Sequence, residues 1–250
     1  MIRSIVQTRI LGVIPARFAS SRFPGKALTL IAGKPMLQHV YERACQARYL
    51  SKVIIATDDE RIRDAARKFS APVQMTRADH ASGTDRVAEV AESDSAEVIV
   101  NIQGDEPLID PNAIDGAVFG LLEDDQAPMA TLAKRIEFSA EVTNPNVVKV
   151  VSDLSGNAIY FSRCPIPYVR EGGAVHFKHI GLYVYRRDFL LAYSGLPVGP
   201  LERAERLEQL RALENGYRVR VIETDYESLG VDTPEDLEHV AALFEPSLYK

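Results

Sequence analysis

Short apolar runs alternate with helical patterns along the first hundred residues, and this alternation limits the fold more than any other feature. Near-continuous apolar runs occupy residues 10–16, 53–56, 72–75 and 98–102. Helical spacing of apolar residues separates them over residues 36–45, 58–69 and 83–92. Apolar strands joined by helices are typical of a parallel sheet covered on both faces. We therefore predict an α/β fold whose ligand lies at the carboxyl ends of the strands.

The second half of the chain has a more mixed pattern. Strand-like runs occupy residues 147–151, 158–161, 181–185 and 218–222, and helical patterns occupy residues 201–213 and 234–244. There is no internal repeat, low-complexity tract or clear linker. We predict one domain over residues 1–250, with a first part at about 10–130, a smaller β-rich insertion at about 131–230 and a closing helix at 231–250.

Composition excludes several classes of protein. Of the 250 residues, 46% are hydrophobic and 26% are charged, which is typical of a globular protein with a large core. The net charge of −6 argues against a nucleic acid partner, and no apolar run is long enough to span a membrane. Cys45 and Cys164 have neither disulfide-framework nor zinc-ligand spacing. We expect a cytoplasmic protein without a membrane or nucleic acid partner.

A cationic loop follows the first apolar run, in the stretch VIPARFASSRFPGK. It carries Arg17, Arg22 and Lys26 against an acidic background. It is not a P-loop, because Ser20 and Ala27 stand where that motif needs a glycine and a hydroxyl residue. Small residues and cations suit a polyphosphate, since backbone N–H groups can approach the anion closely. On charge alone, a solvated surface loop remains an alternative.

Two aspartates favour the polyphosphate interpretation. Asp105 follows an apolar strand in NIQGDEP, and Asp232 precedes the closing helix in GVDTPEDLE. Thr233 and Asp236 already have the spacing of a helix capping box, so Asp232 is not needed as a cap. Two carboxylates together with phosphate oxygens and water are ligands that magnesium prefers. We predict that both aspartates bind magnesium.

A series of longer motifs runs in the same order as in one known family. These are PARFASSRFPGK, ATDDERI, MTRADHASGTDR, VNIQGDEP, YFSRCPIP, KHIGLYVYR, LERAERLEQLR and GVDTPEDLE. Over residues 11–243 the chain resembles the 3-deoxy-manno-octulosonate (Kdo) cytidylyltransferases, the CMP-Kdo synthetases of lipopolysaccharide synthesis. The resemblance implies a fold like that of the nucleotide-diphospho-sugar transferases, a homodimer, and magnesium-dependent transfer of CMP from CTP to the anomeric hydroxyl of an acid sugar.

The resemblance also implies the roles of the nucleotide-side residues. Arg17 and Lys26 would hold the triphosphate with Arg22 as a third cation, and Asp105 and Asp232 would hold Mg²⁺; Arg17, Lys26 and the two aspartates form the catalytic set. Arg77, Ser82 and Gly83 would flank the cytidine, and Gln103 would lie between nucleotide and sugar. Two alternatives stay open: Ser82 and Asp85 also fit an ordinary capping box, and Gln103 fits a strand-end hydrogen bond.

By the resemblance, residues at about 10–130 would be the nucleotide-binding half, and residues at about 131–230 the acid-sugar-binding and dimerisation part. Arg163 would bind the sugar carboxylate, because a guanidinium can donate to both oxygens. The resemblance assigns the sugar hydroxyls to His179, Tyr183, Glu208 and Gln209, together with Gln103. His179 and Tyr183 could instead be structural strand residues, and Glu208 and Gln209 could be exposed positions in the middle of the helix predicted over 201–213.

Rival functions make different demands on the sequence. The 8-amino analogue of Kdo or another acid sugar would use the same residues, whereas a sugar-1-phosphate enzyme needs an added cation for that phosphate. A nucleotide-binding regulator without catalysis would have lost a carboxylate or Lys26, and all three groups are present.

Overall fold

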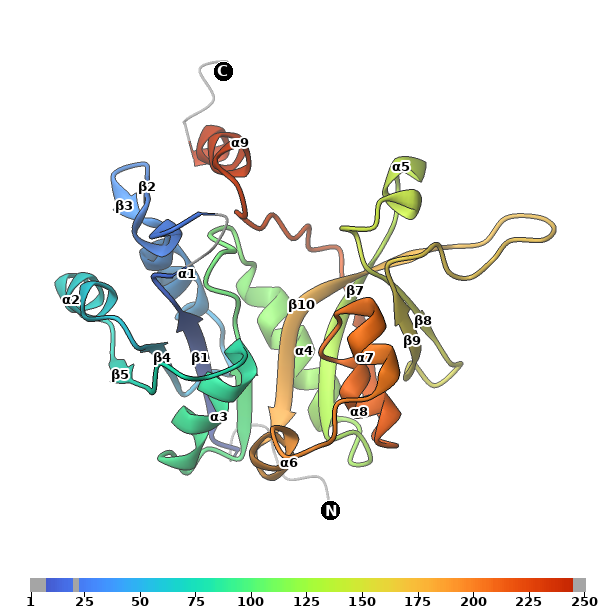
Figure 1. Ribbon diagram of the computed structural model, residues 1–250, viewed down its shortest axis with the longest axis horizontal. Helices are drawn as coiled ribbons and strands as arrows, with labels where there is room; N and C mark the ends of the chain where they lie inside the picture. The colour runs from blue at the N-terminus through green and yellow to red at the C-terminus, as the bar shows by residue number, and fades with distance from the viewer. Residues whose placement is uncertain (1–7, 20–22, 245–250) are drawn as a thin grey trace. The chain divides into compact units, whose positions relative to one another are not determined.

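The computed structural model describes residues 8–19 and 23–244 and divides the chain into two compact units (Figure 1). The first unit comprises Arg9–Asn112 and the chain from Ser228 onward, and the second comprises Ala113–Glu227. The second unit is thus inserted in the sequence of the first. This inserted unit runs from residue 113 to residue 227, whereas the sequence pattern predicted an insertion over about residues 131–230.

The sheet of the first unit is parallel, as predicted. Its strands are β1 (Ile10–Ala16), β4 (Lys52–Thr57), β5 (Val73–Met75) and β6 (Val98–Asn101), in the order β6-β1-β4-β5. The register pairs Gly12 of β1 with Val53 on one side and with Val100 on the other. Most of these strand residues are buried, which explains why the runs are apolar on both faces.

The strand order creates a switch point between β1 and β6. From β1 the chain passes through α1 (Met36–Ala44) to β4 and through α2 (Glu60–Lys68) to β5. It then returns through α3 (Gly83–Glu92) to β6 on the opposite side of β1. Because the direction of travel reverses there, the loops that leave the carboxyl ends of β1 and β6 border a crevice, which is where such sheets bind ligands.

The last described helix, α9 (Pro234–Phe244), closes a separate apolar cluster of the first unit. Val231 and Val240 pack there with Ile31, at the hairpin of β2 (Leu30–Ile31) and β3 (Lys34–Pro35), and with Met36 at the start of α1. The predicted capping box is confirmed: Thr233 Oγ1 accepts from Asp236 N at 3.2 Å, and Asp236 Oδ2 accepts from Thr233 N at 2.9 Å.

The second unit is the predicted β-rich part. Its strand β7 (Met129–Arg135) pairs in parallel with β11 (Val219–Glu223) and antiparallel with β10 (Phe177–Arg186). Two further strands extend it antiparallel, β8 (Lys149–Ser152) beside β10 and β9 (Ala158–Ser162) beside β8. Short helices α5 (Ser139–Thr143) and α6 (Arg187–Tyr193) lie between these strands in sequence.

The helix α4 (Pro111–Leu122) and β7 were not predicted from the sequence. Gly116 and Gly120 lower the helix propensity of this stretch. Gly120 is there because α4 packs very closely on β11: a Cβ at Gly120 would lie 2.2 Å from Ile222 Cγ1. The glycine that weakens the helical pattern in the sequence is therefore needed for the packing of α4 on β11.

The helix predicted over residues 201–213 is wrong. Two short helices, α7 (Pro200–Glu205) and α8 (Leu210–Glu214), replace it, and Arg206 between them is left-handed with φ 55°. Glu202 and Arg211 form an ion pair at 2.6 Å between the two helices. In one continuous helix these residues would face roughly 180° apart, so the break is what lets them meet.

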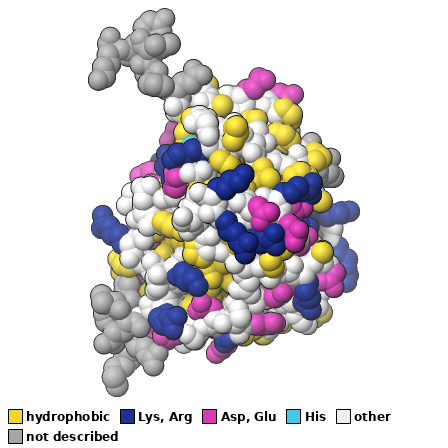
Figure 2. Space-filling model, turned by 90° about the vertical axis from the view of Figure 1, so that its left-hand side faces the viewer, with side chains coloured by type: hydrophobic (Ala, Val, Ile, Leu, Met, Phe, Trp, Pro, Cys, Tyr) yellow, Lys and Arg dark blue, Asp and Glu magenta, His cyan; other side chains and the backbone are white. Residues whose placement is uncertain are grey.

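The surface charges of the α2 side largely neutralise each other. Figure 2 shows Lys and Arg side chains interspersed with Asp and Glu on this face. Arg61 pairs with Asp59, and Arg63 pairs with Asp64, all at or near α2. Within residues 8–19 and 23–244, no helix has the length and apolar character needed to cross a membrane.

Candidate functional site

A pocket of about 520 Å³ opens in the first unit at the carboxyl ends of β1 and β6. Five predicted site residues line it together: Arg17, Lys26, Gln103, Asp105 and Asp232. They come from the loop after β1, the 3-10 helix η2 (Lys26–Leu28), the loop after β6 and the segment before α9. The structure therefore gathers at the switch point residues up to 215 positions apart in sequence, from 17 to 232.

Gly104 lines this pocket, and Gly25 lies next to its Lys26. A Cβ at Gly104 would lie 2.9 Å from the carbonyl oxygen of Pro15, so only glycine lets the loop after β6 approach the end of β1 this closely. Gly25 is left-handed with φ 75° and directly precedes Lys26. The position of Gly104 in NIQGDEP, directly after a strand, was the available signal.

Lys26 lies between the two aspartates. Its Nζ donates to Asp105 Oδ2 at 2.7 Å, to Asp232 Oδ1 at 3.0 Å and to the carbonyl oxygen of Val231 at 2.8 Å. The backbone supports this arrangement, because Val231 N donates to the carbonyl oxygen of Asp105 at 2.9 Å. Burial lowers the pKa of Lys26, but the charges and hydrogen bonds of Asp105 and Asp232 outweigh burial, so the pKa is raised overall.

The same geometry tests whether the site fits a divalent cation. Two carboxylates converge on one positive charge, and they keep side-chain exposures of 31% and 48%, so ligand and water can reach them. Across the described part of the chain, no group of three or more His, Cys, Asp or Glu residues could form a metal cage. A pair of carboxylates that leaves the other positions to water and phosphate fits Mg²⁺.

The remaining nucleotide-side predictions fall in three places. Arg17 is exposed at the edge of the pocket, and Arg22 lies outside the described residues. Among the described residues, Arg77, Ser82 and Gly83 stand outside the pocket lining. Gly83 nevertheless brings the start of α3 against Pro15, because a Cβ there would lie 3.6 Å from the Pro15 ring. The capping box of Ser82 and Asp85 is present, with both hydrogen bonds at 3.1 Å.

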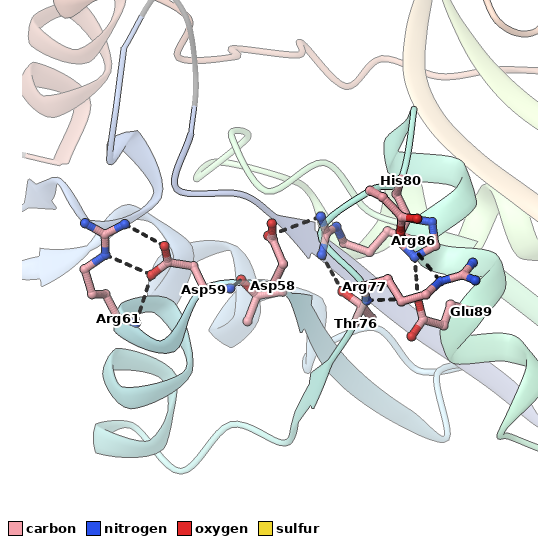
Figure 3. Close-up of polar contacts among 10 residues, drawn as sticks. Asp58, Asp59, Arg61, Thr76, Arg77, His80, Arg86 and Glu89 are labelled. Atoms are coloured by element: carbon pink, nitrogen blue, oxygen red, sulfur yellow. Dashed lines mark hydrogen bonds and ion pairs between the residues drawn. The ribbon is translucent and has the colours of Figure 1, made fainter.

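A polar network holds the loop that carries Arg77 (Figure 3). Glu89 on α3 bonds to the His80 ring and accepts from Arg77 N at 3.1 Å. Beside it, the buried guanidinium of Arg86 pairs with Asp58 at 3.1 Å and donates to Thr76 Oγ1. The loop between β5 and α3 is thus fixed from both ends. The side chain of Arg77, which lies in this loop, stays 70% exposed, so a ligand can reach it.

A bulge in β10 brings together two of the predicted sugar ligands in the second unit. The register shifts between Ile180 and Tyr183, so His179 faces Ala133 while Tyr183 faces Thr131. The two rings therefore lie on one face of the strand with centroids 5.5 Å apart. This proximity could not be foreseen from His-x-Gly-x-Tyr, because a regular strand would separate positions 179 and 183 by about 13 Å.

His179 is held as a neutral ring. Its Nε2 lies 2.9 Å from Thr131 Oγ1, and the Thr131 hydroxyl also reaches the carbonyl oxygens of Ile180 and Leu182. Because that hydroxyl has one proton to give to a carbonyl, the ring donates to it from Nε2. Burial lowers the pKa of His179 to about 3, so the imidazole is uncharged at neutral pH.

Gln209, from a distant part of the sequence, contacts the same pair of rings through Tyr183. Tyr183 OH donates to Gln209 Oε1 at 3.2 Å, while the amide Nε2 of Gln209 is buried without a partner among the described residues. A buried amide with an unused donor is costly, and a ligand hydroxyl can accept its hydrogen bond. Glu208 and Gln209 lie between α7 and α8, so their predicted place in the middle of a helix is wrong.

Arg163 follows β9 directly and is held by backbone carbonyls. Its Nε donates to the carbonyl oxygen of Glu205 at 2.8 Å, and its Nη1 donates to that of Pro145 at 3.0 Å. The Nη2 group has no partner among the described residues. The guanidinium therefore keeps Nη2 and one Nη1 hydrogen for an anion, a set that can still bind both oxygens of a carboxylate end-on.

Comparison with known proteins adds independent findings. A family model described as cytidylyltransferase matches residues 11–224. A 3-deoxy-manno-octulosonate cytidylyltransferase from Solibacter usitatus is 69% identical over 96% of this chain and 96% of its own length. One from Geobacter sulfurreducens is 57% identical over 92% and 97%. A solved CMP:2-keto-3-deoxy-manno-octonic acid synthetase complexed with CTP is 47% identical, has a TM-score of 0.91, and covers 94% of this chain and 98% of its own.

Proposed function

The chain belongs to the family of 3-deoxy-manno-octulosonate cytidylyltransferases, and we propose that it transfers CMP from CTP to Kdo, releasing pyrophosphate. The observation that carries this proposal is the convergence of Asp105 and Asp232 on one cation beside Arg17, at the switch point of the sheet. A triphosphate brings several negative charges, and this pocket places cations beside two carboxylates that would hold a metal.

In the reaction, the anomeric hydroxyl of Kdo loses its proton to water and its oxygen forms a bond to the α-phosphorus. The bond between the α-phosphorus and the bridging oxygen breaks, and pyrophosphate leaves with that oxygen. Arg17 and Lys26 offset the charge that builds on the leaving pyrophosphate. Asp105 and Asp232 would hold magnesium, which supplies Lewis-acid polarisation of the phosphate and lowers the pKa of a bound hydroxyl. Lys26 bonds both carboxylates, so it can orient them before ligands arrive.

The second unit supplies the acid-sugar contacts. Arg163 has end-on donors for the sugar carboxylate, and the Gln209 amide has an unused donor for a hydroxyl. His179 is neutral, so it adds no charge next to the sugar and would contact it only through hydrogen bonds and packing. Gln103 at the end of β6, with Arg77, Ser82 and Gly83 around the start of α3, would contact the nucleotide.

The decisive experiment is pyrophosphate release from CTP with a panel of sugars. We expect turnover with Kdo in the presence of Mg²⁺ and its loss when the metal is chelated. Other arms are the 8-amino analogue, sialic acid and a hexose 1-phosphate. Turnover with the hexose phosphate but with neither Kdo nor its amino analogue would refute the acid-sugar assignment.

We also propose that the protein acts as a homodimer in the cytoplasm. The arm between β9 and β10 exposes apolar side chains, with Tyr168 88% and Val175 46% exposed, and it projects from the second unit in Figure 1. A second copy of the chain would cover them. Cys45 and Cys164 are exposed free thiols, which suits a reducing compartment. Light scattering that gives a monomer mass at micromolar concentration would contradict the dimer.

A further inference from the structure

Glu205, the last residue of α7, is not among the predicted site residues, but its side chain binds the turn that carries Arg163. Its carboxylate accepts from Ser162 Oγ at 2.6 Å through Oε1 and from Arg163 N at 2.9 Å through Oε2. Tyr160 OH reaches Oε1 at 3.5 Å. Ser162 in turn accepts from Cys164 N at 3.0 Å, so the whole turn that follows β9 is tied to this one carboxylate.

The backbone of Glu205 completes the arrangement. In a longer helix its carbonyl oxygen would accept from the N–H group four residues on, at Gln209. The left-handed Arg206 ends α7 instead, and the freed carbonyl accepts from Arg163 Nε at 2.8 Å. The side chain of Glu205 therefore fixes the main chain of Arg163, while its carbonyl fixes the guanidinium.

We propose that Glu205 is a positioning residue that sets the Arg163 guanidinium for the carboxylate of the acid sugar. This inference rests on the proposed function, since Arg163 is the sugar-acid ligand there. Glu205 also begins the turn that leads to Glu208 and Gln209, so one residue fixes both sugar-binding segments relative to each other. It acts through these groups and does not itself touch the reacting atoms.

The geometry uses both carboxylate oxygens at this position. Both oxygens accept, one from a hydroxyl and one from an N–H group. The Glu205→Gln amide has one acceptor oxygen, so this oxygen must stay with Arg163 N, and the NH₂ group then donates to Ser162 Oγ and reverses that hydrogen bond. The charge-assisted character of both hydrogen bonds is lost while side-chain volume is kept.

The test compares Glu205→Gln with Glu202→Gln in the same helix. Glu202 is the matched control, because it forms a partly buried pair with Arg211 at 2.6 Å and does not contact Arg163. For Glu205→Gln we expect the KM for Kdo to rise about tenfold, equivalent to about 1.4 kcal/mol, with the KM for CTP unchanged. For Glu202→Gln we expect both KM values to stay within about twofold, although its melting temperature falls.

A double-mutant cycle separates positioning from general structural support. If Glu205 acts through Arg163, Glu205→Gln should lower kcat/KM for Kdo by less than about twofold when Arg163 is already alanine. An undiminished tenfold loss in that background would overturn the proposal, as would equal increases of KM for CTP and Kdo. If Glu205→Gln does not fold, Ser162→Ala removes one anchor without stranding a charge, and the same cycle applies with a loss of about threefold expected.

Failure of the proposed function gives a different result. In that case the wild-type protein would not use Kdo at any concentration. The positioning role fails on its own when wild type uses Kdo, Arg163→Ala impairs that use, and Glu205→Gln does not.

Discussion

Replacing Lys26 with methionine isolates the effect of its ammonium group. Methionine keeps most of the apolar stem and removes the charge that holds Asp105 and Asp232 together. The loss leaves two carboxylates facing each other at a place where each had been 3.0 Å or less from Lys26 Nζ. We expect a less stable protein whose site has become a better divalent-cation ligand.

The magnitude follows from the contacts. A hydrogen bond to a charged group contributes about 1.5–3 kcal/mol when its loss strands the partner. Asp105 and Asp232 are 31% and 48% exposed, so water offsets much of that loss, and we take about 1 kcal/mol for each. A total of about 2 kcal/mol lowers the melting temperature of a chain of this length by roughly 4–8 °C.

Magnesium should restore much of the stability that Lys26→Met loses. In the wild-type protein the ammonium already neutralises the carboxylates, so Mg²⁺ alone gains little. In Lys26→Met the ion meets two carboxylates that have lost the ammonium between them, and at ten times its Kd it adds about 1.4 kcal/mol of stability. The measurement is calorimetric melting with and without Mg²⁺, in the absence of nucleotide.

Lys34→Met is the matched control. Lys34 pairs with Glu42 at 2.7 Å, but both side chains are at least 40% exposed, and such surface pairs contribute at most about 1 kcal/mol. Its melting temperature should stay within about 3 °C of wild type, without a response to Mg²⁺. A Lys26→Met protein that melts like wild type, or that gains no more from Mg²⁺ than wild type does, would refute the reasoning.

Three further predictions concern the remaining site residues. Asp232→Asn should lower turnover by roughly two orders of magnitude or more in a pyrophosphate-release assay, because a charged metal ligand is lost while Thr233 still caps α9; near-normal turnover at limiting Mg²⁺ would exclude a metal role. Arg163→Ala should lower kcat/KM for Kdo by roughly 30-fold to several thousand-fold and leave CTP binding intact, since a stranded carboxylate costs about 2–5 kcal/mol; equal use of Kdo by variant and wild type would contradict it. The folded-state pKa of His179 lies at about 3, below its unfolded value of 6.5, so its contribution to stability is present above pH 6.5 and is lost as the pH falls towards 3. Between pH 6.5 and 5 the loss is up to about 2 kcal/mol, and urea titrations should show a smaller loss for His179→Gln over the same range.

The parts of the fold that depend on local sequence were predicted well. The strand β1, the helices α3 and α9, and both capping boxes have the bounds or contacts that the sequence indicated. Apolar runs, caps and prolines act within a few residues, so a reader of the sequence sees the whole cause. The proximity of Arg17 and Asp105 was also predictable, because parallel strands bring their carboxyl ends to one edge, whereas the strand pattern did not place Asp232 there.

What could not be predicted depends on partners far away in the sequence. The break at Arg206 goes together with the Glu202–Arg211 pair between the two helices, whereas helical periodicity alone favoured one helix. The bulge beside Thr131 puts His179 and Tyr183 together, and nothing in their spacing announces it. The position of Lys26 between two aspartates is likewise set by a segment that returns more than 200 residues later.

The discontinuous first unit has a consequence for synthesis on the ribosome. Its sheet strands leave first, but Asp232, α9 and the core residues Val231 and Val240 are made only after the 115 residues of Ala113–Glu227. Asp232 follows Asp105 by 127 residues, so at usual elongation rates of about 5–20 residues per second the second carboxylate of Lys26 is made roughly 6–25 s after the first. During that interval Ile31 and Met36 lack the apolar cover they have in the finished protein. The inserted unit can complete its own fold in this time, so the nascent chain closes its nucleotide pocket last.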